Sequence, residues 1–412
     1  MRMGESGRTI SIGVLGLGAR GFEQVKLLAT MPDIDIRAVC DKHADRVART
    51  QQHLSDCGRP AEGATDPQAV IDRQDIEAVI IMTDWETHID LAVRAMESGK
   101  HAAMEVGGAD SIEACWQLVR TSEKTGKQCM LLENCCYGKE EMTLLNMIRQ
   151  GVFGELVHCQ GGYEHDLRDE IGEGDINRHY RQHHFLRRNG ELYPTHELGP
   201  IAKYLDLNYG NRMLSLCAMS SKAAGLHAWL KENRAGSGLE NETVCQGDIV
   251  TTMIKCARGE TILLTHDCTL PRPYSRGGRV QGTKAIWMED NRSIYIDKVS
   301  PRVAGEWAHS WEKDQKYMDE YCPALWREYE TYGKRGGHGG MDYLVFRGFF
   351  EALQNGARCP IDVYDAAAWM CITALSEQSI ALGGAPVPVP DFTNGAWLTR
   401  RDEAQGEYRL GR

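Results

Sequence analysis

The stretch Ile10-Ser11-Ile12-Gly13-Val14-Leu15-Gly16-Leu17-Gly18-Ala19-Arg20-Gly21 begins as a short apolar run and ends in regularly spaced glycines. A helical pattern of apolar residues follows it. The spacing G-x-G-x-x-G between a strand and a helix permits a tight turn and lets backbone N–H groups approach a pyrophosphate. The sequence therefore predicts a dinucleotide-binding turn in which Gly16, Gly18 and Gly21 are the required glycines.

A second apolar run, residues 34–40, ends at Asp41. Asp41 follows the last glycine by about 20 residues, the distance at which a carboxylate holds the ribose 2′-hydroxyl of a dinucleotide. A carboxylate there repels a 2′-phosphate, so NAD is favoured over NADP. The alternative is a glycine-rich turn in some other α/β fold.

Further strand patterns at residues 76–82, 101–106 and 129–132 alternate with helical patterns. This alternation predicts a doubly wound parallel sheet, which binds its ligands at the carboxyl ends of the strands. Each residue at these ends could also be an ordinary loop residue. The strand ends carry Trp85, Glu86, Thr87 and His88, then Glu105 and Val106, then Asn134.

The pattern changes after residue 151. Longer strand patterns at 156–163, 213–219, 248–256, 261–268 and 285–288 are separated in part by short turns, which predicts a mostly antiparallel sheet in an α+β domain. We therefore expect a Rossmann domain at residues 1–137 and a second domain at 138–412. A helix within about residues 340–385 is a candidate to pack back on the first domain.

The segment Tyr193-Pro194-Thr195-His196-Glu197 marks the start of a helix in the second domain. Proline suits the first helical position, which puts His196 in the first turn. The positive end of the helix dipole disfavours an imidazolium there, and a neutral imidazole can accept a proton. The alternative is a capped helix whose His and Tyr make structural hydrogen bonds.

The bulk properties exclude several classes of function. The net charge of −11 argues against nucleic acid as the main partner, and no apolar run reaches membrane-spanning length. The polar start of the chain and 14 scattered cysteines without a C-x-x-C pair predict a cytoplasmic protein. No metal is expected, because His179, His183 and His184 lack an acidic partner at helical spacing, and His338 is interpreted as a turn residue.

The glycine turn, the segment 83–88, Glu105, Asn134 and the His196 helix together resemble the Gfo/Idh/MocA oxidoreductase family. Within it, the segments 130–138, 150–155, 188–190, 193–196 and 336–342 look like glycoside hydrolase family 109, the NAD-dependent α-N-acetylgalactosaminidases. Sugar dehydrogenases of the wider family use a Lys and an Asp for proton transfer. This chain has Val106 and Leu192 at those positions, which disfavours a dehydrogenase of the usual type.

The resemblance implies an open-faced sheet in the second domain through which the chain forms a homo-oligomer, a dimer or a tetramer. It implies that a small carbohydrate or glycoside is the substrate. It implies NAD binding by Arg20, Gly21, Asp41, Trp85, Glu86, Thr87, His88, Glu105, Val106 and Asn134. It implies sugar binding by Tyr163, Arg181, Tyr193, Pro194, Thr195, His196 and Tyr274. The branch commonly has a small residue after the histidine, where Glu197 stands here.

The implied reaction is a retaining hydrolysis by transient C3 oxidation, C1–C2 elimination, water addition and re-reduction. His196 would accept the 3-hydroxyl proton, and Tyr193 or Tyr163 would remove the C2 proton. A tyrosine base needs a lowered pKa, so simple hydrogen bonding to sugar hydroxyls is the alternative for both. The alternative functions are a net sugar or inositol dehydrogenase and a non-catalytic NAD-binding protein.

Overall fold

The computed structural model describes residues 8–302, 309–401 and 405–410. The chain forms two compact units, and the border between them first falls after Gly138. The first unit comprises Met1–Gly138, Ala324–Ala368 and Arg401–Arg412. The second comprises Lys139–Pro323 and Trp369–Arg400. The single second domain expected over 138–412 is thus interrupted, because two of its segments pack with the first unit.

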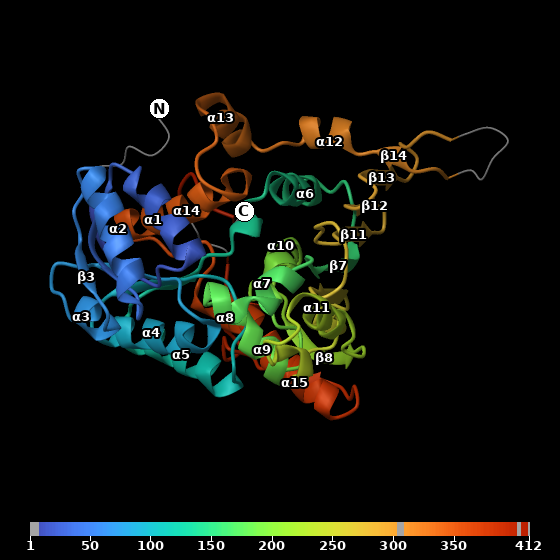
Figure 1. Cartoon of the computed structure of the whole chain (residues 1–412). Helices are drawn as coiled ribbons and strands as arrows, with labels where there is room; N and C mark the ends of the chain where they lie inside the picture. The colour runs from blue at the N-terminus through green and yellow to red at the C-terminus, as the bar shows by residue number, and fades with distance from the viewer. Residues whose placement is uncertain (1–7, 303–308, 402–404, 411–412) are drawn as a thin grey trace. The chain divides into compact units, whose positions relative to one another are not determined.

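The first unit contains a sheet of six strands in the order β3-β2-β1-β4-β5-β6, counted over the described residues, and every neighbouring pair is parallel. Figure 1 shows α1 and α2 on one side of this sheet and α3, α4 and α5 on the other. The predicted doubly wound parallel sheet is confirmed. The strands are β1 (Ile10–Leu15), β2 (Ile34–Cys40), β3 (Glu62–Ala64), β4 (Ala78–Ile81), β5 (His101–Met104) and β6 (Cys129–Leu131). The helices are α1 (Ala19–Ala29), α2 (Ala44–Asp56), α3 (Pro67–Ile71), α4 (Trp85–Glu97) and α5 (Ile112–Thr125).

The C-terminal part of the first unit packs against its N-terminal part. The helix α14 (Met341–Asn355) contacts the short helix η1 (Asn134–Tyr137), and its Arg347 is buried. Arg347 Nη1 donates to both carboxylate oxygens of Asp33 at 2.8 Å. This buried ion pair and the apolar face of α14 explain why the segment belongs to the first unit. The remaining helices there are α13 (Ala324–Tyr332) and η3 (His338–Gly340).

The second unit contains a sheet of nine strands, within the described ranges, in the order β14-β13-β12-β11-β7-β10-β9-β8-β15. Its strands β7 and β10 pair in parallel and the other described pairs are antiparallel, so the predicted mostly antiparallel sheet is confirmed. The longer strands are β7 (Leu156–Glu164), β8 (Met213–Ser220), β9 (Ile249–Cys256) and β10 (Thr261–Asp267). The shorter ones are β11 (Arg279–Gly282), β12 (Ala285–Met288), β13 (Ser293–Ile296), β14 (Glu312–Lys313) and β15 (Val387–Pro388).

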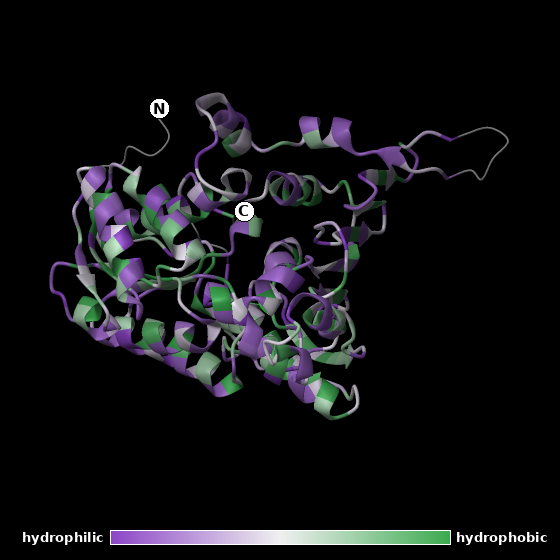
Figure 2. Cartoon of the chain, in the orientation of Figure 1, coloured by the Kyte–Doolittle hydropathy of each residue, from purple (hydrophilic) through white to green (hydrophobic). Residues whose placement is uncertain are grey.

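One face of the second sheet is buried beneath helices. On that face Cys159 of β7, Ile262 of β10, Ile254 of β9 and Trp287 of β12 are each less than 4% exposed. The helix α10 (Thr195–Tyr204) packs against β7 on this side. Figure 2 shows hydrophilic and hydrophobic residues alternating along the helices, as expected of helices that cover a sheet.

The other helices of this unit are mostly short. They are α6 (Lys139–Arg149), α7 (Arg168–Gly172), α8 (Gly174–Asn177), α9 (Arg181–Arg187), α11 (Gly225–Asn233), η2 (Leu239–Asn241), α12 (Gln315–Glu320) and η4 (Ala396–Leu398). The long helix α15 (Val363–Ala381) contains the border between the two units. No helix formed by residues 8–302, 309–401 and 405–410 is long and apolar enough to cross a membrane.

Candidate active site

The glycine-rich turn between β1 and α1 needs its glycines for steric reasons. Gly16 has φ of +93°, and a Cβ on it would lie 2.3 Å from the carbonyl oxygen of Met82. A Cβ on Gly21 would lie 2.1 Å from the carbonyl oxygen of Gly16. Gly18 is the residue immediately before α1. The turn therefore brings backbone close to backbone at the N-terminus of a helix, where an anionic group such as a pyrophosphate binds well.

Asp41 lies directly after β2 and its carboxylate faces this turn. Asp41 Oδ2 accepts a hydrogen bond from the backbone N–H of Leu17 at 2.7 Å, and Oδ1 accepts one from His43 N at 2.9 Å. Arg46 Nη1 lies 3.6 Å from Asp41 Oδ2. The carboxylate is thus fixed beside the glycine turn, in the arrangement that suits a ribose hydroxyl.

Arg20 and Asn134 meet at a residue that the sequence reasoning did not assign to the site, Asp342. Arg20 Nη1 donates to Asp342 Oδ2 at 2.7 Å, and Nη2 donates to Oδ1 at 2.9 Å. Asn134 Nδ2 donates to Asp342 Oδ1 at 2.7 Å, and Arg20 Nε donates to Glu105 Oε2 at 2.8 Å. Burial alone would raise the pKa of Asp342, but hydrogen bonds from His338 and Arg20 hold it well below its usual range. Asp342 is therefore charged and fixes both predicted NAD residues.

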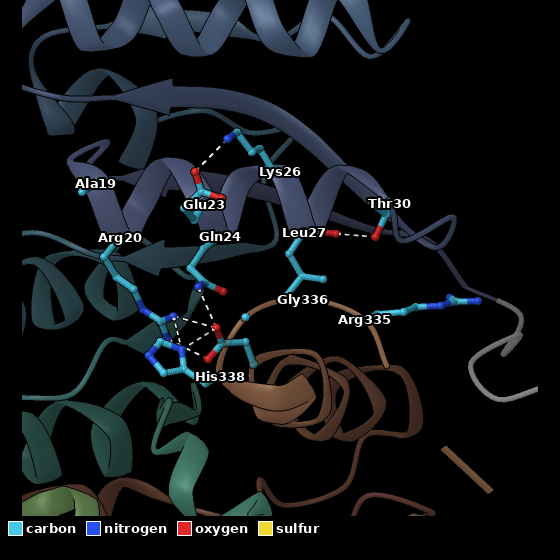
Figure 3. A pocket seen from close by; sticks show the side chains of 12 residues that line it. Ala19, Arg20, Glu23, Gln24, Lys26, Leu27, Thr30, Arg335, Gly336 and His338 are labelled. Carbon is cyan, nitrogen blue, oxygen red and sulfur yellow. Dashed lines mark hydrogen bonds and ion pairs between the residues drawn. The ribbon is translucent and has the colours of Figure 1, made fainter. Parts of the chain in front are cut away.

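A cavity of about 970 Å³ lies beside this ion-pair group, between α1 and the segment 335–342. Figure 3 shows Arg20 and His338 pointing toward one another at one end of it. Arg20 Nη1 and His338 Nδ1 are 3.1 Å apart, and His338 Nδ1 is 3.0 Å from Asp342 Oδ2. The sequence around His338 predicts a turn residue. It does lie in a glycine-rich turn, and its ring also contacts the Arg20–Asp342 pair.

Four other predicted NAD residues lie in the first turn of α4, two of them buried and two exposed. Trp85 is buried against Gly107, whose Cβ would lie 2.3 Å from Trp85 Cδ1. His88 is fully buried, its Nε2 lies 3.0 Å from the carbonyl oxygen of Thr83, and burial lowers its pKa. Trp85 and His88 thus pack inside the protein and shape the carboxyl end of β4. The side chains of Glu86 and Thr87 are exposed. Outside α4, the backbone N–H of Val106 donates to Glu105 Oε1 at 3.1 Å.

Three predicted sugar-binding residues come together in the second unit. Tyr163 lies near the end of β7, and Tyr193 and His196 lie at the start of α10. The ring centroids are 4.4 Å apart for Tyr163 and Tyr193, 4.8 Å for Tyr193 and His196, and 5.5 Å for Tyr163 and His196. His196 is in the first turn of α10 as expected, but the helix begins at Thr195, so Pro194 is the residue before it rather than its first.

Arg181, the first residue of α9, places its charged guanidinium beside the rings of Tyr163 and Tyr193. Its Cζ lies 5.6 Å from the ring centroid of Tyr163 and 5.1 Å from that of Tyr193, and Nη1 donates to Glu170 Oε1 at 3.0 Å. Burial opposes the charge, but Tyr163 and Glu170 keep the pKa of Arg181 well above its ordinary value. A buried, fixed cation beside two tyrosines can hold an oxygen atom that carries negative charge.

Tyr163 also contacts a histidine that sequence reasoning missed. Tyr163 Oη and His165 Nδ1 are 3.2 Å apart, and the His165 ring lies 5.1 Å from the ring of Tyr274. Tyr274, the last of the predicted sugar-binding residues, is 51% exposed. Burial raises the pKa of Tyr163 despite the opposing charge of Arg181. The lowered pKa that a free tyrosine base needs is therefore not found at Tyr163.

Glu197 follows His196, and its side chain packs against β7. Its side chain is 7% exposed and lies over Gly161 of β7. Glu197 Oε2 is 3.7 Å from Arg276 Nε, and Arg276 also forms an ion pair with Glu141. Burial raises the pKa of Glu141 to about 7, against the charge of Arg276. Glu197 thus belongs to a buried group of two carboxyls and one guanidinium under the first turn of α10.

Comparisons with known proteins identify the family of the chain. Residues 10–132 match the sequence model of the oxidoreductase family with an NAD-binding Rossmann fold, and residues 137–399 match that of the glycosyl hydrolase 109 C-terminal domain. A glycosyl hydrolase family 109 protein of Stenotrophomonas maltophilia is 41% identical, over 96% of this chain and 91% of its own length. An alpha-N-acetylgalactosaminidase of Tannerella forsythia is 38% identical, over 97% of this chain and 89% of its own length.

Solved structures show the same fold. A levoglucosan dehydrogenase in complex with NADH superposes with a TM-score of 0.68 at 18% identity, covering 93% of this chain and all of that one (100%). The myo-inositol 2-dehydrogenase of Lactobacillus plantarum gives a TM-score of 0.65 at 12% identity, over 93% of this chain and 100% of its own. The resemblance seen in the sequence motifs is confirmed: the chain has an NAD-binding Rossmann domain and belongs to glycosyl hydrolase family 109.

Proposed function

We propose that this chain is an NAD-dependent, retaining glycosidase of the α-N-acetylgalactosaminidase type. The observation that carries the proposal is the position of His196 in the first turn of α10, in ring contact with Tyr163 and Tyr193 and near Arg181. The Asp and Lys of the sugar dehydrogenases are replaced by Leu192 and Val106. His196 is thus the strongest remaining proton acceptor. The names of the relatives support the substrate class.

The residues of the first unit fit NAD. Because a side chain at Gly16 or Gly21 would clash with backbone, the turn is bare backbone that a pyrophosphate can approach. The Asp41 carboxylate suits a ribose 2′-hydroxyl. Glu105 and Asn134, both held by the Arg20–Asp342 pair, would line the side of the cofactor nearer the reaction. Bound NAD would supply a reversible hydride acceptor for C3 of the sugar, so that the ring carries a ketone while the glycosidic bond breaks.

At the sugar, the side chains of the second unit have distinct tasks. His196 accepts the proton of the 3-hydroxyl and later returns it. The ketone at C3 makes the C2 hydrogen acidic, and Tyr163 or Tyr193 removes it as the aglycone leaves C1. Arg181 stabilises the enolate oxygen by its fixed charge. Water then adds at C1 on the face that the aglycone left, so the configuration is retained. Glycosidases that use NAD in this way need no pair of catalytic carboxylates.

The test is a panel of nitrophenyl glycosides incubated with the NAD-loaded protein in deuterated water. We expect nitrophenol release from an α-N-acetylgalactosaminide, deuterium at C2 of the released sugar and no accumulating NADH absorbance. His196→Ala should lower the rate by about 100-fold or more, as removal of a general base does. His227→Ala on α11 is the matched control and should be unchanged. Turnover by His196→Ala at the wild-type rate would refute the mechanism.

The same experiment separates the other functions. A net sugar or inositol dehydrogenase would give NADH in proportion to the free sugar consumed. A non-catalytic NAD-binding protein would bind the cofactor without nitrophenol release or C2 exchange. Either result would replace the glycosidase proposal.

A further inference from the structure

The end of β7 presents two side chains to the same side of the strand. Residues two apart in a strand point the same way, so His165, just after β7, follows Tyr163, while Glu164 between them turns to Arg272. The backbone N–H of His165 donates to the carbonyl oxygen of Asp267 at 2.8 Å, which fixes its position. Its Nδ1 lies 3.2 Å from Tyr163 Oη. The imidazole is therefore hydrogen-bonded to the phenol of a proposed sugar-binding tyrosine.

The environment of Tyr163 poses a chemical problem for the proposed C2 base. The residue is 7% exposed, and burial raises the pKa of its phenol, so the phenolate is scarcely populated at neutral pH. A neutral phenol can take a proton from C2 only if it gives up its own proton in the same step. The group that could receive that proton must be a neutral acceptor within hydrogen-bond distance of Tyr163 Oη.

We propose that His165 is this acceptor: a positioning residue that acts through Tyr163 and allows its phenol to remove the C2 proton. The inference rests on the proposed oxidation–elimination reaction. In the elimination step the C2–H bond breaks and a new O–H bond forms at Tyr163 Oη. The original phenolic O–H bond breaks and an N–H bond forms at His165 Nδ1. The C2–H electron pair becomes the C1–C2 double bond, and the aglycone departs from C1 with its bonding pair. Both proton transfers reverse when water adds.

The charged groups around His165 favour the state that this step needs. Burial and the charge of Arg181 lower the pKa of His165, whereas Glu170, Asp166 and Asp169 raise it by smaller amounts. His165 is therefore neutral at neutral pH, and its Nδ1 accepts a hydrogen bond when Nε2 carries the ring proton. As the pH falls through this lowered pKa, Nδ1 becomes protonated and the acceptor is lost.

The variant that isolates proton acceptance is His165→Asn. An asparagine oxygen can accept the hydrogen bond of Tyr163 near the position of Nδ1, but it cannot take the proton. His158→Asn is the matched control, because His158 is a partly buried histidine on the same strand that bonds Thr261. With a 3-keto nitrophenyl glycoside as substrate, elimination needs no hydride transfer. We expect His165→Asn to lower its nitrophenol release at least 100-fold with little change in KM, and His158→Asn to leave it unchanged.

The pH profile gives a readout that a structural role would not move. The wild-type elimination rate should fall on the acid side with the titration of His165, and this limb should disappear in His165→Asn. Wild-type rates in the His165→Asn variant would overturn the proposal. If the protein eliminates the 3-keto compound but releases no aglycone from intact glycosides, the proposed hydrolysis fails while the Tyr163–His165 step stands.

A measurement without substrate tests the same hydrogen bond. With tyrosine labelled by ¹³C at Cζ, the Tyr163 resonance, assigned with Tyr163→Phe, should shift as His165 titrates, because the hydrogen bond reverses when Nδ1 gains a proton. The shift should vanish in His165→Asn and remain in His158→Asn. A Tyr163 resonance that does not follow the titration of His165 would overturn the proposal even if no glycoside is turned over.

Discussion

The side chain of Glu197 lies directly over the backbone of Gly161, so closely that a Cβ on Gly161 would come within 1.6 Å of Glu197 Cγ. Gly161 and Tyr163 point to the same side of β7, and Glu197 directly follows His196 on α10. The absence of a side chain at residue 161 therefore sets how closely the first turn of α10 approaches β7. The contact between His196 and Tyr163 depends on that approach.

We expect Gly161→Ala to destabilise the protein by about 2 kcal/mol, because overpacking of a close contact costs about 1–3 kcal/mol. The added methyl group must push Glu197 aside, which also disturbs its ion pair with Arg276. Glycoside turnover should fall with it, because His196 moves with the same turn. Denaturant unfolding and nitrophenol release measure the two effects.

The double variant Gly161→Ala/Glu197→Ala is the control for this steric explanation. Removing Glu197 beyond Cβ takes away the atom that the new methyl group would meet. The sum of the losses of unfolding free energy in the two single variants should then clearly exceed the loss in the double variant. If the two single losses simply add, the free-energy cost of Gly161→Ala arises within β7 and not from the contact with Glu197.

Glu191 gives a prediction on pH-dependent stability. It is 1% exposed, Oε1 accepts a hydrogen bond from Tyr193 N at 3.4 Å, and burial raises its pKa to about 8. The folded state therefore holds a proton that the unfolded state releases above its ordinary pKa of about 4.5. Stability is highest below that value and falls as the pH rises toward 8, by up to about 1.4 kcal/mol per pH unit for one proton.

Glu191→Gln imitates the protonated acid and should remove this loss. The unfolding free energy of the variant should match the wild type at about pH 4 and exceed it at pH 8.5. Glu62→Gln, a surface carboxyl on β3, should leave the pH profile unchanged. Equal pH profiles for wild type and Glu191→Gln would mean that Glu191 is ionised in the folded protein.

The fold could be predicted because its signals are local. The glycine turn, Asp41 after the second strand and the alternation of strands and helices each lie within a short stretch, and each follows from steric or burial rules. The same holds for His196, whose place in a first turn needs only the proline before it. Even there the helix begins one residue later than expected, at Thr195, because helix ends depend on context.

The missing parts of the site depend on contacts between distant residues. Arg20 and Asp342 are 322 positions apart in the chain, so no spacing rule could pair them. The hydrogen bond of Tyr163 to His165 requires knowing that β7 continues in the same direction past its last paired residue. The burial of Glu197 requires knowing that α10 packs over Gly161. The sequence could name these residue types but not their partners.

The position of Asp41 predicts the choice between NAD and NADP. Its carboxylate is fixed by Leu17 N and lies 3.6 Å from Arg46, so it would repel a 2′-phosphate that Arg46 could otherwise meet. We expect Asp41→Ser to weaken NADH binding and strengthen NADPH binding, changing the ratio of the two Kd values by about 100-fold, or about 2.7 kcal/mol. Fluorescence titration with both nucleotides measures it. Asp35→Ser, on the surface of β2, is the control and should keep the wild-type ratio.

The outer face of the second sheet predicts self-association, the expectation that the family resemblance raised. One row across this face runs through Cys217, Met253, Leu263, Gln160 and Arg279, which are paired strand by strand. Met253 near its middle is 39% exposed, and Leu263 beside it is partly exposed. Cys217, Met253 and Leu263 place apolar side chains on three neighbouring strands, a surface that a second copy of the chain could bury, and Gln160 and Arg279 continue the row as polar residues. Light scattering after size exclusion should therefore give a dimer or tetramer for the wild type.

Met253→Glu should give a smaller species with little loss of stability, because it changes an exposed position. Leu382→Glu, at a 58% exposed position just after α15, is the matched control and should leave the mass unchanged. A monomeric wild type, or a Met253→Glu variant of unchanged mass, would show that this face is not where copies of the chain meet.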